Sequence, residues 1–128
     1  MKFRLVLAFF LAISGFAMAQ PLLAHHSGAS YDSDHQINLT GTVSNFEWTN
    51  PHVFIYLDVK EESGNVVQWR VEGNSPNMLA RAGWRKEMIK EGDKITVNGA
   101  PAKNKSPILR LINLTLASGV KFDGQGFK

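Results

Sequence analysis

The chain contains no cysteine, and this absence excludes several classes of protein at once. Without thiols there can be no disulfide framework, no thiolate metal centre and no cysteine nucleophile. A secreted domain of about 100 residues generally buries enough apolar surface to fold without such cross-links. The chain also lacks a Gly-x-Ser-x-Gly elbow, a phosphate loop and a dinucleotide fingerprint. We therefore expect a binding domain and not an enzyme.

Long hydrophobic runs are also scarce. The one clear run, Leu5 to Phe16, follows a positively charged start and precedes a small-x-small site that ends at Ala19. The run is shorter than the roughly 20 apolar residues that cross a bilayer. This order predicts a secretory signal peptide over residues 1–19, with cleavage after Ala24 as the alternative. We expect a periplasmic protein with no transmembrane segment once the signal peptide is removed.

Neither sign of charge is in large excess. The formal net charge is +3, and two of the basic residues, Lys2 and Arg4, lie in the predicted signal peptide, which contains no acidic residue. The exported chain is therefore close to neutral, whereas a nucleic-acid-binding protein needs a strongly basic face. We expect no nucleic-acid partner, and instead an envelope ligand or a protein partner.

From Ile37 onward, apolar and polar side chains alternate, which is typical of β-strands. The apolar phase shifts near Ser44 and Asn45, and this shift predicts a β-bulge in the first strand. Between the third and fourth strands, Ser75 suits a helix N-cap and Gly83 suits a helix stop. The pattern predicts strands from 37 to about 48, over 53–59, 67–72 and 94–98, and from 108 to about 116.

Three strands, a short helix and two more strands follow the order of the oligonucleotide/oligosaccharide-binding (OB) barrel. We therefore predict a mainly β fold, a small five-stranded OB-like barrel over residues 37–118 with one short helix between strands three and four. Residues 20–36 are predicted to form an N-terminal arm, and residues 119–128 a flexible tail. A small β-sandwich or an open five-stranded sheet with the helix on one end is the alternative.

Several short motifs occur in an order and spacing that resemble a known family. The chain is similar, from His25 to about Ser118, to small exported bacterial proteins catalogued as a domain of unknown function. The resemblance implies export and a small barrel, and it implies no particular activity. The motifs that show it include Ala24-His25-His26-Ser27, Trp48-Thr49-Asn50-Pro51-His52, Ser75-Pro76-Asn77 and Arg81-x-Gly83-Trp84.

A ligand site is predicted on the outward side of the second and third strands. A hairpin turn at Ser63 and Gly64 would place Tyr56 opposite Arg70, and aromatic rings beside an arginine can stack on planar groups and pair with anions. The alternative is that the arm or the helix covers this side, so that the rings serve packing alone. The predicted ligand-binding residues are Trp48, Asn50, His52, Phe54, Tyr56 and Arg70.

The histidines suggest a second function, that of a copper- or zinc-binding accessory protein. The candidate ligands are His25, His26, His35 and His52, because imidazole is the commonest metal ligand in proteins. Cleavage after Ala24 would free the α-amino group of His25 for copper chelation, whereas cleavage after Ala19 would not. Against a metal site, the sequence suggests no acidic residue beside His52 that would orient its ring.

Overall fold

The structure is a computed structural model, and it describes residues 30–125. The predicted signal peptide, His25 and His26 lie outside the described residues, as do the last three residues of the predicted tail. None of the helices in the described part is long and apolar enough to cross a membrane.

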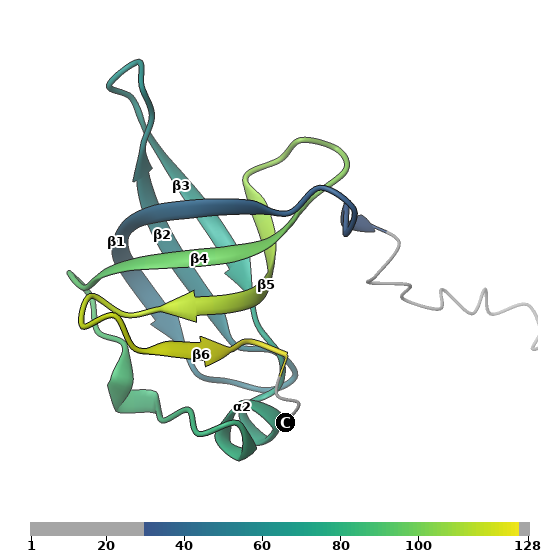
Figure 1. Cartoon of the computed structure of the whole chain (residues 1–128), viewed down its shortest axis with the longest axis vertical. Helices are drawn as coiled ribbons and strands as arrows, with labels where there is room; N and C mark the ends of the chain where they lie inside the picture. The colour runs from purple at the N-terminus through teal and green to yellow at the C-terminus, as the bar shows by residue number, and fades with distance from the viewer. Residues whose placement is uncertain (1–29, 126–128) are drawn as a thin grey trace, which may run out of the picture.

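Five strands close into a barrel, which confirms the predicted OB-like fold (Figure 1). Antiparallel pairing links β3, β2, β1, β4 and β5 in that order, and a parallel pairing of β3 with β5 closes the ring. Each strand alternates buried and more exposed side chains, so one face of every strand lines the core. The strands are β1 (Ile37–Glu47), β2 (Phe54–Lys60), β3 (Val66–Glu72), β4 (Lys94–Pro101) and β5 (Ile108–Thr115).

The first strand bends so that it can pair with β4 along one half and with β2 along the other. The predicted bulge is confirmed, because the register of β1 against β2 shifts between Val43 and Asn45. At Gly41 an added Cβ atom would lie 2.5 Å from the carbonyl oxygen of Asp58. Only glycine therefore allows β1 to approach β2 this closely at the bend.

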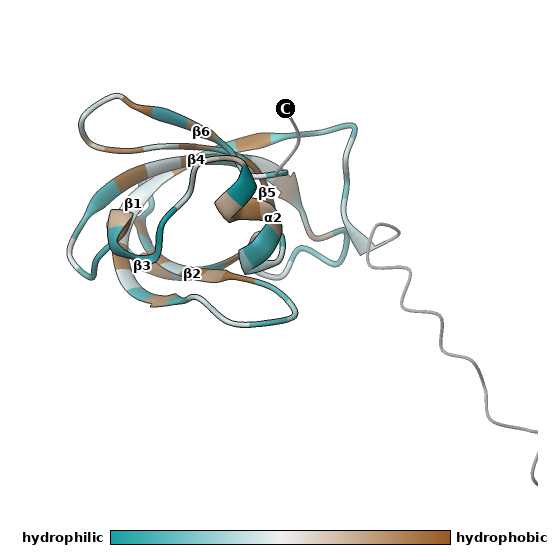
Figure 2. Cartoon of the chain, turned by 90° about the horizontal axis from the view of Figure 1, so that it is seen from below, coloured by the Kyte–Doolittle hydropathy of each residue, from teal (hydrophilic) through white to brown (hydrophobic). Residues whose placement is uncertain are grey.

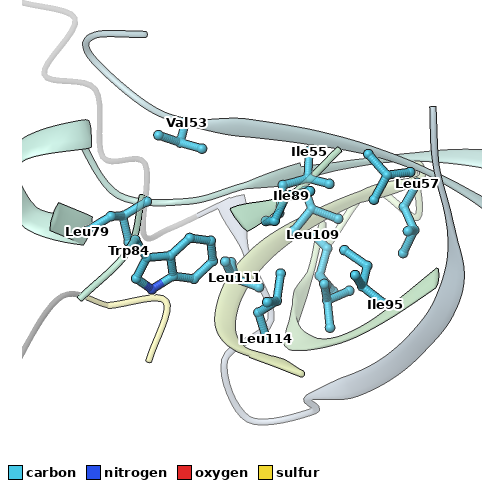
Figure 3. Packing of buried hydrophobic residues seen from close by; sticks show 13 residues of the cluster. Val53, Ile55, Leu57, Leu79, Trp84, Ile89, Ile95, Leu109, Leu111 and Leu114 are labelled. Atoms are coloured by element: carbon cyan, nitrogen blue, oxygen red, sulfur yellow. The ribbon is translucent and has the colours of Figure 1, made fainter. Parts of the chain in front are cut away.

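One end of the barrel is covered by the short helix α2 (Pro76–Arg81), followed by the 3₁₀ turn η3 (Lys86–Met88) (Figure 2). The predicted caps are confirmed. The Ser75 side chain accepts a hydrogen bond from the Met78 N–H, and Gly83 follows the helix with a φ of 93°. Figure 3 shows Leu79 and Trp84 together at one end of the core cluster, and both side chains are buried.

A sixth strand, β6 (Lys121–Asp123), pairs with β5 in the region that the sequence predicted to be a loose tail. The carbonyl oxygen of Asp123 accepts a 2.9 Å hydrogen bond from the indole Nε1 of Trp84. The ring of Phe122 lies 5.8 Å from that of Trp84, centroid to centroid. The strand is too short to show alternation in the sequence, and it is held by its pairing with β5 and by these contacts with Trp84.

Candidate functional site

The outward side of the β2–β3 hairpin has the predicted register. Tyr56 lies directly opposite Arg70, and Phe54 lies opposite Glu72. The guanidinium carbon of Arg70 is 5.4 Å from the centroid of the Phe54 ring, within the range of a cation–π contact. Arg70 is exposed and both rings are half-buried. Three of the predicted ligand-binding side chains therefore form one continuous patch.

The segment that leads into β2 holds the other predicted ligand-binding residues. Trp48 is half-buried, packs against the core and lies 5.9 Å from the ring of Phe46. Asn50 is exposed, and the peptide bond that joins it to Pro51 is cis. Trp48 thus contributes to packing, and His52 contacts the β2–β3 hairpin.

A carboxylate orients His52, so the interpretation that no acidic residue lies beside it was wrong. Oε1 of Glu72 lies 2.5 Å from Nδ1 of His52. The side chain of Glu72 is 11% exposed and that of His52 is 32% exposed. The two residues are distant in sequence, and only the β2–β3 register together with the turn before β2 brings them together. Nε2, the other ring nitrogen of His52, takes no part in this contact.

The same carboxylate binds a residue of the N-terminal arm. Oε2 of Glu72 accepts a 2.5 Å hydrogen bond from the hydroxyl of Tyr31. Tyr31 is 8% exposed and forms a β-bridge with Ala102. Burial and the Glu72 carboxylate raise the pKa of Tyr31 to about 12, although the guanidinium groups of Arg70 and Arg110 act in the opposite direction. Residues 30–32 of the predicted arm are therefore docked on the barrel.

A pocket of about 370 Å³ lies where this docked segment meets β3 and the loop between β4 and β5. Figure 1 shows residues 30–36 and that loop next to each other, away from α2. Of the residues in the pocket wall, only Arg70 was a predicted site residue. The signal for the others was slight: a lone tyrosine in the arm and a basic, polar loop before β5. The polar lining comes from Ser30, Tyr31, Arg70, Lys103, Asn104 and Ser106.

The candidate metal ligands are not brought together in the described part of the chain. The side chain of His35 is 82% exposed, and its Nδ1 lies 3.0 Å from Oδ2 of Asp32. Between residues 30 and 125, no group of three or more His, Asp or Glu side chains could hold a metal ion. His25 and His26 lie outside that range, so their place relative to His52 stays a prediction.

Comparisons with known proteins support the fold and are silent on the ligand. A family model described as "Family of unknown function (DUF6152)" matches residues 14–108. No curated protein matches the chain. Among solved structures, it is similar to a mitochondrial single-stranded DNA binding protein of S. cerevisiae, Rim1 (Form2), with a TM-score of 0.50 and 12% identity, over 65% of this chain and 93% of that one. At this identity the likeness shows a shared fold alone.

Proposed function

The chain belongs to the family of unknown function DUF6152, and we propose that it is an exported, periplasmic binding module without catalytic activity. Its ligand lies on the outward face of β2 and β3. The main support is the patch formed by Phe54, Tyr56 and Arg70, in which the guanidinium lies over one ring and directly across the ladder from the other. Such a patch stacks on flat ligand surfaces and pairs with anionic groups.

An envelope ligand with sugar rings and anionic groups matches this patch. The exported chain is close to neutral in net charge, so the long-range attraction that draws nucleic acids to a strongly basic face is weak. The similar mitochondrial protein is described as a single-stranded DNA binding protein. We nevertheless propose a glycan of the envelope, because the patch is compact and the chain as a whole is not strongly basic.

The test is calorimetric titration of the full mature protein with soluble peptidoglycan fragments. Tyr56→Ala and Arg70→Ala should each weaken binding about tenfold or more, since each removes one side of the patch. Lys121→Ala, which removes an exposed charge on β6, should leave affinity unchanged. Equal affinity of all four proteins, or no binding by any of them, would contradict the proposed ligand face.

A copper- or zinc-binding role is the second candidate, and the His52–Glu72 contact favours it. Histidines that ligate metals usually pair their other ring nitrogen with a carboxylate, which fixes the ring and strengthens the ligand. Glu72 does this for Nδ1 of His52 and leaves Nε2 for a metal. His25 and His26 would have to supply the remaining ligands from outside the described residues.

Mass spectrometry of the mature protein, with and without added copper, separates the two candidates. Metal binding requires a copper adduct that is lost in His52→Ala and in His25→Ala. The same spectra give the mass of the mature chain and so distinguish cleavage after Ala19 from cleavage after Ala24. Absence of an adduct from the unmodified protein would exclude the copper role.

A further inference from the structure

We propose that the pocket between the docked arm, β3 and the β4–β5 loop binds the phosphate group of a phosphomonoester. The inference rests on the proposed function, because Arg70 belongs both to the ligand face and to the pocket wall, and it specifies the anionic group of the ligand as a phosphate. The volume of about 370 Å³ is at the small end of ligand sites, which span roughly 300–1,000 Å³. A phosphate with a small organic group fits such a space.

Within residues 30–125, the positive charge at the pocket has no salt-bridge partner. Arg70 and Lys103 line the wall, and Arg110 lies beside Glu72 in the β3–β5 ladder. Among residues 30–125 the ion pairs are His35 with Asp32 and His52 with Glu72, so none of these three cations is paired there. The neighbouring carboxylate, Glu72, is already engaged by Tyr31 and His52. An anionic ligand would supply the missing charge.

The loop also contributes an amide side chain, that of Asn104, to the pocket wall. Oδ1 of Asn104 accepts hydrogen bonds from the backbone N–H of Ser106 at 3.0 Å and from its hydroxyl at 2.7 Å. A backbone N–H can only donate, so the amide oxygen must face Ser106, and the Asn104 NH₂ group is left for a ligand. With the guanidinium and the ammonium group, the wall offers more donors than the two oxygens of a carboxylate need. The three terminal oxygens of a phosphate match this set better.

The Arg70 guanidinium and the backbone of the loop are held in place before any ligand arrives. The Arg70 guanidinium lies over the Phe54 ring, and the backbone N–H of Lys103 donates a 3.0 Å hydrogen bond to the carbonyl of Ser30. On the other side of the bridge, the Asp32 N–H donates to the Pro101 carbonyl at 2.9 Å. The arm is therefore tied to the end of β4 and to the loop, one hydrogen bond on each side of Tyr31. A preformed wall of this kind lowers the entropic cost of binding.

The loop offers a matched pair of variants. Lys103 lines the pocket, whereas Lys105, two positions along the same loop, does not. Lys103→Met and Lys105→Met remove the same charge and keep a similar chain length. With glycerol 3-phosphate as the probe, Lys103→Met should weaken binding about tenfold or more, because a charge-assisted hydrogen bond is lost. Lys105→Met should weaken it less than about twofold, because Lys105 does not line the pocket and its longer-range attraction is screened by salt.

The titration follows backbone amide resonances of the full mature protein, with shifts of residues 102–106 as the mark of pocket binding. A second titration uses vesicles of phosphatidylcholine containing phosphatidic acid, which present the same phosphate group on a lipid. Binding of the soluble ester assigns the pocket to free phosphomonoesters, and binding of the vesicles alone assigns it to a lipid headgroup. Both results support the inference if Lys103→Met weakens binding about tenfold or more and Lys105→Met weakens it less than about twofold.

Three results would overturn it: no binding of either glycerol 3-phosphate or the phosphatidic acid vesicles, equal effects of the two lysine variants, or equally tight binding of acetate. Tighter binding of an oligothymidylate, with no shift from glycerol 3-phosphate, would replace it with a nucleic-acid role. Tyr56→Ala separates this inference from the proposed function. If peptidoglycan fragments bind and depend on Tyr56 while glycerol 3-phosphate does not bind, the ligand face stands and the phosphate pocket fails.

Discussion

The region around Trp84 and the region around Glu72 both join an outlying segment to the barrel, and they do so with opposite chemistry. Trp84 is 1% exposed and packs with Leu79 in the apolar cluster, with one hydrogen bond to the carbonyl of Asp123. Glu72 instead joins the arm and the turn before β2. Its partly exposed carboxylate contacts the Tyr31 hydroxyl and the His52 imidazole.

The difference separates what holds the fold from what is available for binding. Burial of a large aromatic ring contributes several kcal/mol and is indifferent to pH and ligands. Hydrogen bonds to a single carboxylate contribute less, and they respond to charge nearby. The pocket and the aromatic–arginine patch lie on the Glu72 side. Mutations can test how sharply the two regions divide these tasks.

Trp84→Ala should have the largest effect on stability. Removing a fully buried indole deletes its contacts and leaves a cavity, and such changes cost about 3–5 kcal/mol. We expect chemical denaturation to show this loss in the free energy of unfolding. Val66→Ala serves as the control, because Val66 is 63% exposed, and a change of less than about 0.5 kcal/mol is expected there. A loss below about 1 kcal/mol for Trp84→Ala would contradict the assignment of Trp84 to the core.

Glu72→Ala should come next, at about 2 kcal/mol, because it leaves the Tyr31 hydroxyl and the His52 ring without their shared partner. Glu47 is a matched control: it lies on the same outward side, across Phe54 from Glu72, and its carboxylate contacts only the Asn45 amide at 3.3 Å within residues 30–125. Glu47→Ala should cost less than about 0.5 kcal/mol. Glu72→Ala should also lower the pKa of Tyr31, because the Glu72 carboxylate is one of the causes of its rise. Equal stability losses in Glu72→Ala and Glu47→Ala would contradict the role of Glu72 as the shared partner of Tyr31 and His52.

The same contrast between apolar and polar regions explains what the sequence could predict. The alternation of apolar and polar residues predicted five strands. Together with the hairpin turn, it also predicted that Tyr56 lies opposite Arg70, as the structure shows. The caps at Ser75 and Gly83 specified the helix. All of these signals are local or involve one hairpin, and the apolar core enforces them.

The contacts that define the Glu72 region have no local signal. Tyr31, Glu72 and His52 come from three segments. His52 meets Glu72 through the β2–β3 register and the turn before β2, and Tyr31 reaches Glu72 because the arm pairs with Ala102. The alternation of apolar and polar residues in β3 predicted an outward side chain for Glu72. It did not indicate which residues that side chain contacts. β6 was missed because three residues are too few to show alternation, and its contacts with Trp84 come from a part of the chain far away in sequence.

Tyr31→Phe should cost about 1 kcal/mol at neutral pH, since it removes one hydrogen bond and keeps the ring. The folded-state pKa of Tyr31 is raised to about 12, above a value near 10 for the unfolded chain. Folding therefore favours the protonated hydroxyl, and this contribution is complete below about pH 10 and is lost as the pH rises toward 12. The stability difference between the unmodified protein and Tyr31→Phe should shrink over that interval.

Tyr56→Phe is the control for Tyr31→Phe, because the chain has two tyrosines and only the Tyr31 hydroxyl binds Glu72. Phenolate absorbance of the Tyr56→Phe variant reports Tyr31 alone. An absorbance midpoint near pH 10 in that variant would show that the arm is not docked as described.

His35→Ala should have the smallest effect. His35 pairs with Asp32 at 3.0 Å, but its side chain is 82% exposed, and such surface pairs contribute about 0–1 kcal/mol. We expect an unchanged free energy of unfolding, because the arm is held by Tyr31 and by the backbone hydrogen bonds of Asp32 and Lys103. If His35→Ala instead destabilised the protein as much as Tyr31→Phe, the arm would depend on its exposed end and not on the Glu72 carboxylate. If it removed a copper adduct, His35 would join His52 as a ligand, and the arm would serve the metal site.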